Sequence, residues 1–110
     1  MDENKTVRLV NRTFVSALTV GATLLVAGQG ASRFIRVLSV VVWVVGLAVN
    51  IKFQSGATDI CPVIRLGQAT GTVLPFNPHG WFQTNPGDAL NVNLSAASQT
   101  SVLISWCLGQ

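Results

Sequence analysis

Charged side chains are scarce in this chain. Asp, Glu, Lys and Arg make up 10% of its 110 residues, against about 25% in a typical soluble domain, while 49% of the residues are hydrophobic. The seven basic residues leave a net charge of only +3 and are spread over the first two thirds of the sequence, at Lys5, Arg8, Arg12, Arg33, Arg36, Lys52 and Arg65. This spread argues against the basic patch of a nucleic-acid-binding protein. The apolar excess indicates that the chain covers surface with partners or lies in a membrane.

Groups that could perform catalysis are equally few. The chain has one histidine, His79, and four carboxylates, of which Asp2 and Glu3 lie at the very start. None of its serines stands in a nucleophile-elbow sequence, and His79 lies in a Pro-His-Gly segment typical of an exposed turn. We therefore expect that the protein is not an enzyme and has no catalytic residues.

The sequence also lacks the patterns that bind metals or cofactors. Its two cysteines, Cys61 and Cys107, have none of the close Cys or His neighbours that structural zinc sites use. The glycines of residues 67–71 are not followed by Lys-Ser or Lys-Thr, so they do not form a phosphate loop. The first residues do not resemble a secretory signal, and in a reducing cytosol we expect two free, buried thiols rather than a disulfide. No cofactor and no metal are expected.

Two long stretches without charge, residues 13–32 and 37–51, raise the alternative of a small membrane protein. The first contains three glycines and several hydroxyl side chains, and the second is short for a bilayer and rich in valine, which favours strands. After Gly46 the sequence alternates strictly, with Leu47, Val49, Ile51 and Phe53 on one side. A period of two predicts a strand, and residues 37–42 are interpreted as a strand that is apolar and buried on both faces.

Short apolar runs separated by turn residues continue along the chain. We predict strands at residues 6–10, 14–18, 22–27, 35–42, 47–53, 60–66, 72–74, 80–84, 90–95 and 102–108. The sequence Asn85-Pro-Gly-Asp88 matches a type II turn, with proline at the second position and glycine at the third. Short strands without room for crossover helices predict an all-β fold, an antiparallel β-sandwich of jelly-roll type.

The last two strands predict the core most clearly. Leu90, Val92 and Leu94 should point inward while Asn91 and Asn93 point outward. In the final strand, one face should be formed by Val102, Ile104, Trp106 and Leu108, with Trp106 in the core.

Five aromatic residues could have a role in binding. They are expected to lie in the core or in an oligomer interface, although they could also form a sugar-binding face. They are Trp43, Phe76, Trp81, Phe82 and Trp106.

Residues 35–110 resemble the capsid decoration proteins of tailed bacteriophages, also called cement or staple proteins, which have a jelly-roll fold. Four segments carry the resemblance: Ile35-Arg-Val-Leu-Ser39, Ile51-Lys-Phe-Gln-Ser-Gly-Ala-Thr58, Val73-Leu-Pro-Phe-Asn-Pro-His-Gly-Trp-Phe82 and Gly87-Asp-Ala-Leu-Asn-Val-Asn-Leu-Ser95. The resemblance implies a virion protein that is made in the cytoplasm of the bacterial host. It would form a homodimer or homotrimer, bind the major capsid protein on the outer surface of the shell, and stabilise the shell against the pressure of packaged DNA. Direct contacts with nucleic acid or a membrane are not expected. A receptor- or glycan-binding module of a head or tail fibre is the alternative.

The N-terminal residues 1–12 lie outside the resemblance and precede a single β-sandwich domain, residues 13–110. Their apolar and basic residues suit an arm that adds a strand to a neighbour and meets an acidic surface. Lys5, Val7, Arg8, Leu9 and Arg12 are therefore candidate partner-binding residues. An ordinary first strand of the same sheet is the competing interpretation.

Overall fold

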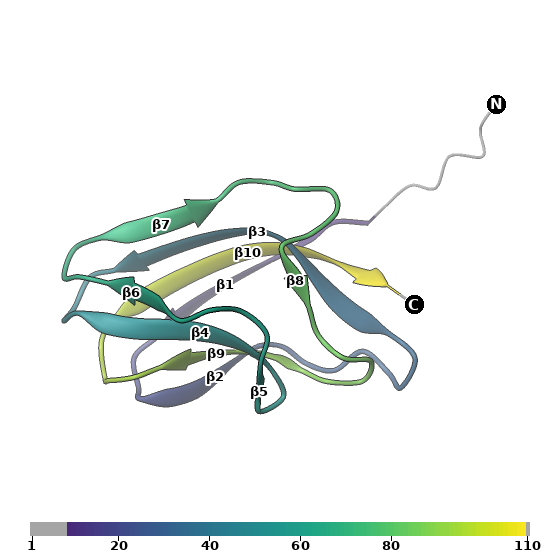
Figure 1. Ribbon diagram of the computed structural model, residues 1–110, viewed down its shortest axis with the longest axis horizontal. Coiled ribbons are helices and arrows are strands. Elements are labelled where there is room, and N and C mark those ends of the chain that lie inside the picture. Colours follow the sequence, from purple (N-terminus) through teal and green to yellow (C-terminus); the bar gives the residue numbers. More distant parts are fainter. Residues whose placement is uncertain (1–8, 110) are drawn as a thin grey trace.

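Strands and turns make up the described part of the chain, residues 9–109 of a computed structural model (Figure 1). In chain order the strands are β1 (Asn11–Ala17), β2 (Gly21–Val26), β3 (Phe34–Val44), β4 (Val49–Ser55), β5 (Thr58–Asp59), β6 (Ile64–Leu66), β7 (Gly71–Leu74), β8 (Phe82–Gln83), β9 (Leu90–Leu94) and β10 (Thr100–Gly109). Residues 9–109 contain no helix that is long and apolar enough to cross a membrane. The two charge-free stretches supply β1 to β4 instead.

The strands form two antiparallel sheets. One, here called the β1 sheet, has the order β1-β10-β3-β7, and β8 also pairs with β3. The other, the β2 sheet, has the order β2-β9-β4-β5, and β6 also pairs with β4. The chain crosses between the sheets from β1 to β2, β2 to β3, β3 to β4, β6 to β7, β8 to β9 and β9 to β10. Together with the two strand orders, this is the connectivity of a jelly roll. This arrangement confirms the predicted fold class.

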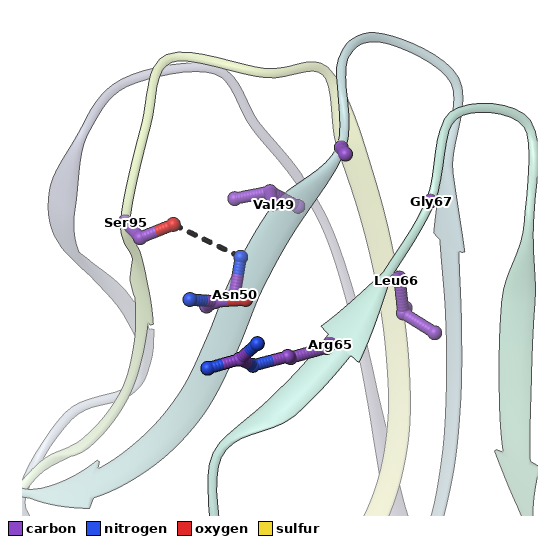
Figure 2. A pocket seen from close by; sticks show the side chains of 7 residues that line it. Val49, Asn50, Arg65, Leu66, Gly67 and Ser95 are labelled. Atoms are coloured by element: carbon purple, nitrogen blue, oxygen red, sulfur yellow. Dashed lines mark hydrogen bonds between the residues drawn. The ribbon is translucent and has the colours of Figure 1, made fainter.

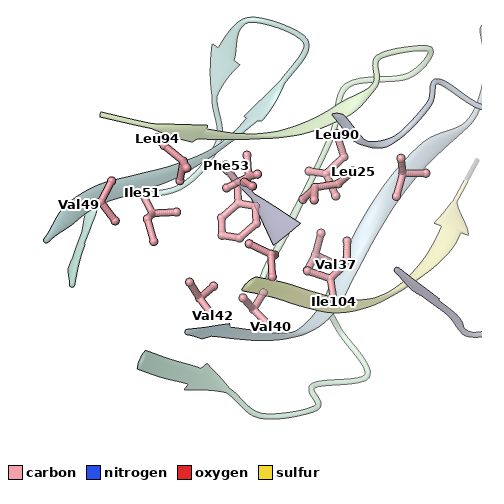
Figure 3. Close-up of a cluster of buried hydrophobic side chains, with 14 of the residues drawn as sticks. Leu25, Val37, Val40, Val42, Val49, Ile51, Phe53, Leu90, Leu94 and Ile104 are labelled. Carbon is pink, nitrogen blue, oxygen red and sulfur yellow. The ribbon is translucent and has the colours of Figure 1, made fainter. Parts of the chain in front are cut away.

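The core lies between the inner faces of the two sheets (Figure 3). Leu90, Val92 and Leu94 are fully buried there, as the alternation in β9 predicts. Phe53, from β4, is also fully buried, and its ring lies 5.2 Å from that of Phe82, which belongs to the β1 sheet. Contacts of this kind across the sandwich join the two sheets into one unit.

Three residues on the apolar sides of the predicted strands are less buried than the alternation suggests. Leu47 is 65% exposed because β4 begins only at Val49, so the alternation in the sequence starts before the strand does. Trp106 was expected in the core but is only half-buried against the core cluster, and its Nε1–H donates to Thr13 Oγ1 at 3.0 Å. Leu108, which pairs with Ile35 near the start of β3, is exposed at the end of the sheet.

The N-terminal residues are described only in part. Thr6, Val7 and Arg8 of the predicted strand at residues 6–10 lie outside the described residues. Leu9 and Val10 are exposed and belong to no strand, and β1 begins at Asn11. Arg12 is therefore the second residue of β1.

Candidate interaction surface

The outer face of the β1 sheet carries a continuous row of apolar side chains. The strand register places Phe14 beside Leu103, Leu103 beside Val41, and Val41 beside Val73. These side chains are 66%, 40%, 39% and 59% exposed, in the order Phe14, Leu103, Val41 and Val73. The row thus crosses all four main strands of the sheet without a polar residue.

Trp43 extends this surface. It lies two residues beyond Val41 on β3, is 51% exposed, and pairs with Gly71 on one side and Ser101 on the other. A Cβ atom at Gly71 would lie 2.4 Å from Cε3 of the indole, so glycine is required for the ring to rest on β7. We call Phe14, Leu103, Val41, Val73 and Trp43 the apolar face.

The apolar face corrects the expectation for β3. Residues 37–42 were predicted to be buried on both faces, and Val37, Val40 and Val42 are indeed buried on the inner face. Val41 is nevertheless exposed on the outer face, together with Trp43. Contiguous exposed apolar surface on a soluble protein typically marks a site of interaction.

The outer face of the β2 sheet is mainly polar, although Leu24 at its β2 margin is 55% exposed. Figure 2 shows Asn50 and Arg65 side by side on β4 and β6, with Ser95 on the other side of Asn50, around a shallow pocket. The backbone N–H of Asn50 donates to Ser95 Oγ at 2.9 Å. An adjoining pocket is lined by Lys52 and Asn93. The two outer faces of the sandwich therefore differ sharply in chemistry.

Of the candidate partner-binding residues, Lys5, Val7 and Arg8 lie outside the described residues. Leu9 is 76% exposed. Arg12 is exposed and lies two residues before Phe14 on β1, so it borders the apolar face. The sequence thus predicted a partner-binding residue, Arg12, at the edge of the apolar face, but it did not predict the apolar face itself.

The aromatic residues do not share one location. Trp43, Phe76 and Trp81 are exposed, whereas Phe82 and Trp106 pack partly against the core. The indole N–H of Trp81 donates to the carbonyl oxygen of Pro75 at 2.8 Å, which fixes the ring against its own loop. Among these aromatics only Trp43 belongs to the apolar face.

The remaining side chains that could catalyse a reaction or bind a metal are spread over the described part of the chain. His79 is exposed, with its backbone N–H donating to Asn77 Oδ1 at 3.0 Å. Among the described residues no three His, Cys, Asp or Glu side chains come together to hold a metal ion. Cys61 and Cys107 are free, with Cys107 buried and Cys61 half-buried in an apolar cleft beside Trp81 and Phe82.

The environment of Cys61 predicts low reactivity. Burial raises the pKa of this thiol, and the nearby Asp59 carboxylate raises it further, against the opposing effect of the Phe53 backbone N–H. A higher pKa leaves less of the reactive thiolate at pH 8. In the native protein we expect Ellman's reagent to label Cys61 at least several-fold more slowly than glutathione and to leave Cys107 unmodified, while urea releases both thiols. Labelling of native Cys61 at the rate of glutathione would contradict this expectation.

Comparisons with known proteins support the fold. No family model matches the sequence, and no curated protein matches it. Among solved structures, the chain is similar to one from Bacillus endospore appendages, described as a novel family of disulfide-linked pili, with 14% identity, a TM-score of 0.54, and coverage of 91% of this chain and 85% of that one.

Two further solved structures are less similar. The sugar-binding C-terminal domain of EclA has 12% identity, a TM-score of 0.45, and coverage of 92% of this chain and 79% of that one. A chain of the virus-like particle of Macrobrachium rosenbergii extra small virus has 12% identity, a TM-score of 0.40, and coverage of 96% and 84%. At 14% identity, the likeness to the endospore appendage chain shows a similar fold and nothing finer.

Proposed function

We propose that this protein is a structural subunit without catalytic activity that binds the outer surface of a tailed-phage capsid. There it stabilises the shell against the pressure of the packaged DNA. The observation that carries the proposal is the apolar face of Phe14, Val41, Trp43, Val73 and Leu103. A chain with 10% charged residues and such an exposed apolar face is better suited to a subunit of an assembly than to a monomeric protein.

The segment most specific to the phage proteins supports the fold on which this role depends. Residues 74–82 connect β7 to β8 and run back along β3, where Asn77 N–H donates to the Leu38 carbonyl at 2.9 Å and Trp81 N–H donates to the Val37 carbonyl at 2.8 Å. Its inner hydrogen bonds join Asn77 to Gly80 and to His79. The resemblance therefore rests on residues whose hydrogen bonds hold the fold, and we propose that the contact with the shell lies elsewhere.

The N-terminal segment is our proposed contact with the major capsid protein. Lys5, Arg8 and Arg12 supply positive charge for an acidic shell surface, and Val7 and Leu9 supply apolar contacts. Leu9, at 76% exposure, makes little contact with the sandwich itself.

Deletion of residues 1–10 tests this contact. We expect the truncated protein to keep its fold, because β1 begins at Asn11, and to lose at least tenfold in affinity for capsids that lack the protein. Circular dichroism checks the fold, and co-sedimentation with capsids measures binding. A control in which residues 1–10 are replaced by a Gly-Ser segment of equal length should behave like the deletion. Full occupancy by the truncated protein would refute the proposed contact.

A glycan-binding module of a phage fibre is the second candidate. The polar outer face of the β2 sheet favours it, because Asn50, Asn93, Ser95 and Arg65 present amide, hydroxyl and guanidinium groups around adjoining pockets. Copy number separates the two functions. A cement protein should be present in numbers close to those of the shell protein, as measured by quantitative mass spectrometry of purified particles, whereas a fibre module should be present in few copies and bind sugars.

A further inference from the structure

We propose that a second copy of this chain covers the apolar face. The two β1 sheets would pack face to face about a two-fold axis that lies between β10 and β3 and runs parallel to the strands. The inference rests on the proposed function, in which this face is an assembly interface. Beyond the expected homo-oligomer, it adds which surface makes the contact, the two-fold symmetry and the side chains that meet.

The order of side chains in the apolar row makes the apolar face complementary to a second copy of itself. Across the sheet the row reads Phe14, Leu103, Val41, Val73. Rotation about the proposed axis reverses this order, so that Phe14 of each copy lies over Val73 of the other and Leu103 lies over Val41. The largest side chain thus meets a small one at both margins, and side chains of similar size meet at the centre.

The next row across the sheet is complementary to itself in the same way. It reads Ser16, Ser101, Trp43, Gly71. On reversal, Trp43 of each copy lies over Ser101 of the other, and its ring, which rests on Gly71 of its own chain, extends toward the partner's Ser16. Each indole would therefore pack over two small hydroxyl side chains, Ser101 and Ser16 of the other copy.

An axis across the strands fits less well. At the height of the apolar row it places Phe14 over Phe14, and between the two rows it places Trp43 over Val41. The first arrangement stacks two phenylalanine rings, and the second sets the indole over a branched side chain instead of a serine, so both are more crowded, and overpacking is unfavourable. The parallel axis also keeps the two Arg12 side chains on opposite margins, about 14 Å apart, which exceeds the screening length of about 8 Å at physiological salt.

The size of the face is close to that of the smallest specific interfaces. β1 is seven residues long and β7 is four residues long, so four strands about 4.8 Å apart give a face of at most roughly 19 by 23 Å. Two such faces cover on the order of 900 Å², and the projecting Phe14 and Trp43 side chains add to this. A specific interface needs about 1,000 Å² or more, so we expect a dimer that dissociates on dilution.

Sedimentation and light scattering test the dimer in solution. We expect the full-length protein to move from monomer to dimer as its concentration rises, and Val41→Lys to raise the dissociation constant at least tenfold, because the introduced ammonium group would face the partner's Leu103. Asn50→Lys is the matched control on the polar outer face and should leave the dissociation constant within about twofold. A full-length protein that stays monomeric at all concentrations, or an equal loss in both variants, overturns the inference.

Chemical cross-linking tests the geometry and does not depend on how well Val41→Lys folds. In a Cys61→Ser background, the double variant Phe14→Cys and Val73→Cys should form covalent dimers with a bis-maleimide that spans about 8 Å, because packed sheets lie about 10 Å apart, too far for a disulfide but within reach of this reagent. Residues 14 and 73 of one chain lie about 14 Å apart, beyond the span of the reagent. Cross-linking by Phe14→Cys alone, or by neither variant, would overturn the proposed axis. Capsid binding is assayed separately. A protein that dimerises but does not bind capsids would refute only the proposed function, and a monomeric protein that binds capsids would refute only the proposed dimer.

Discussion

Replacing Phe53 with alanine is expected to lower the free energy of unfolding by about 3–5 kcal/mol. Phe53 is fully buried in β4, and its ring packs 5.2 Å from that of Phe82 in the opposite sheet. Truncation therefore leaves a cavity at the contact between the sheets, where neighbours on two fixed strands can relax only in part. For a domain of this size the melting temperature should fall by at least about 12 °C, measured by thermal and urea unfolding.

Phe76→Ala is the matched control for this substitution. Phe76 is 57% exposed on the β7–β8 connection, so losing the same ring should change the free energy of unfolding by no more than about 0.5 kcal/mol. Equal melting temperatures for the two variants would show that the ring of Phe53 does not join the two sheets.

Those parts of the fold that depend on residues close together in the sequence could be predicted from the sequence. The alternation of Leu90, Val92 and Leu94 follows from the geometry of one strand, and all three are buried. The turn at residues 85–88 follows from the preferences of proline and glycine. Gly87 has a φ of 84°, and Asp88 N–H donates to the Asn85 carbonyl at 3.1 Å, as a type II turn requires.

The register between strands could not be predicted in this way. Ser105 pairs with Ser39, but the next residue, Trp106, pairs with Val37, so Leu38 is an extra residue in β3. This bulge results from how two distant strands fit together, and the sequence of either strand alone does not reveal it. The prediction for Trp106 was wrong for a related reason, because the sequence does not show where along β10 the opposite sheet ceases to cover it.

The apolar face could not be predicted because a run of valines is compatible with two kinds of strand. The apolar run at residues 37–44 would suit a strand that is covered on both faces by its own chain. It would equally suit a strand whose outer face is covered by another molecule. Only the position of the second sheet distinguishes the two cases. That sheet covers Val40 and Val42 and leaves Val41 and Trp43 exposed.

The second large effect is expected at Ser55, a buried polar residue at the end of β4. Its hydroxyl donates to Asp88 Oδ2 at 2.7 Å and accepts from the backbone N–H of Asn85 at 2.9 Å. It thereby fixes both ends of the turn at residues 85–88 to the β2 sheet. Ser55→Ala leaves a carboxylate without this donor and a backbone N–H without its acceptor, which should cost about 1–3 kcal/mol.

Urea unfolding measures the total loss of stability in Ser55→Ala, and amide hydrogen exchange locates it. The amide of Asn85 should exchange faster in the variant, because its acceptor is gone, while amides in the centre of β10 should change only with global stability. Ser32→Ala is the control, since Ser32 is exposed in the turn between β2 and β3 and its hydroxyl makes no hydrogen bond within the described residues. It should stay within about 0.5 kcal/mol of the parent protein. If Ser55→Ala matched this control, or if exchange at Asn85 were unchanged, the turn would be held by its own proline and glycine, and the hydroxyl of Ser55 would add nothing to the joint between β4 and β9.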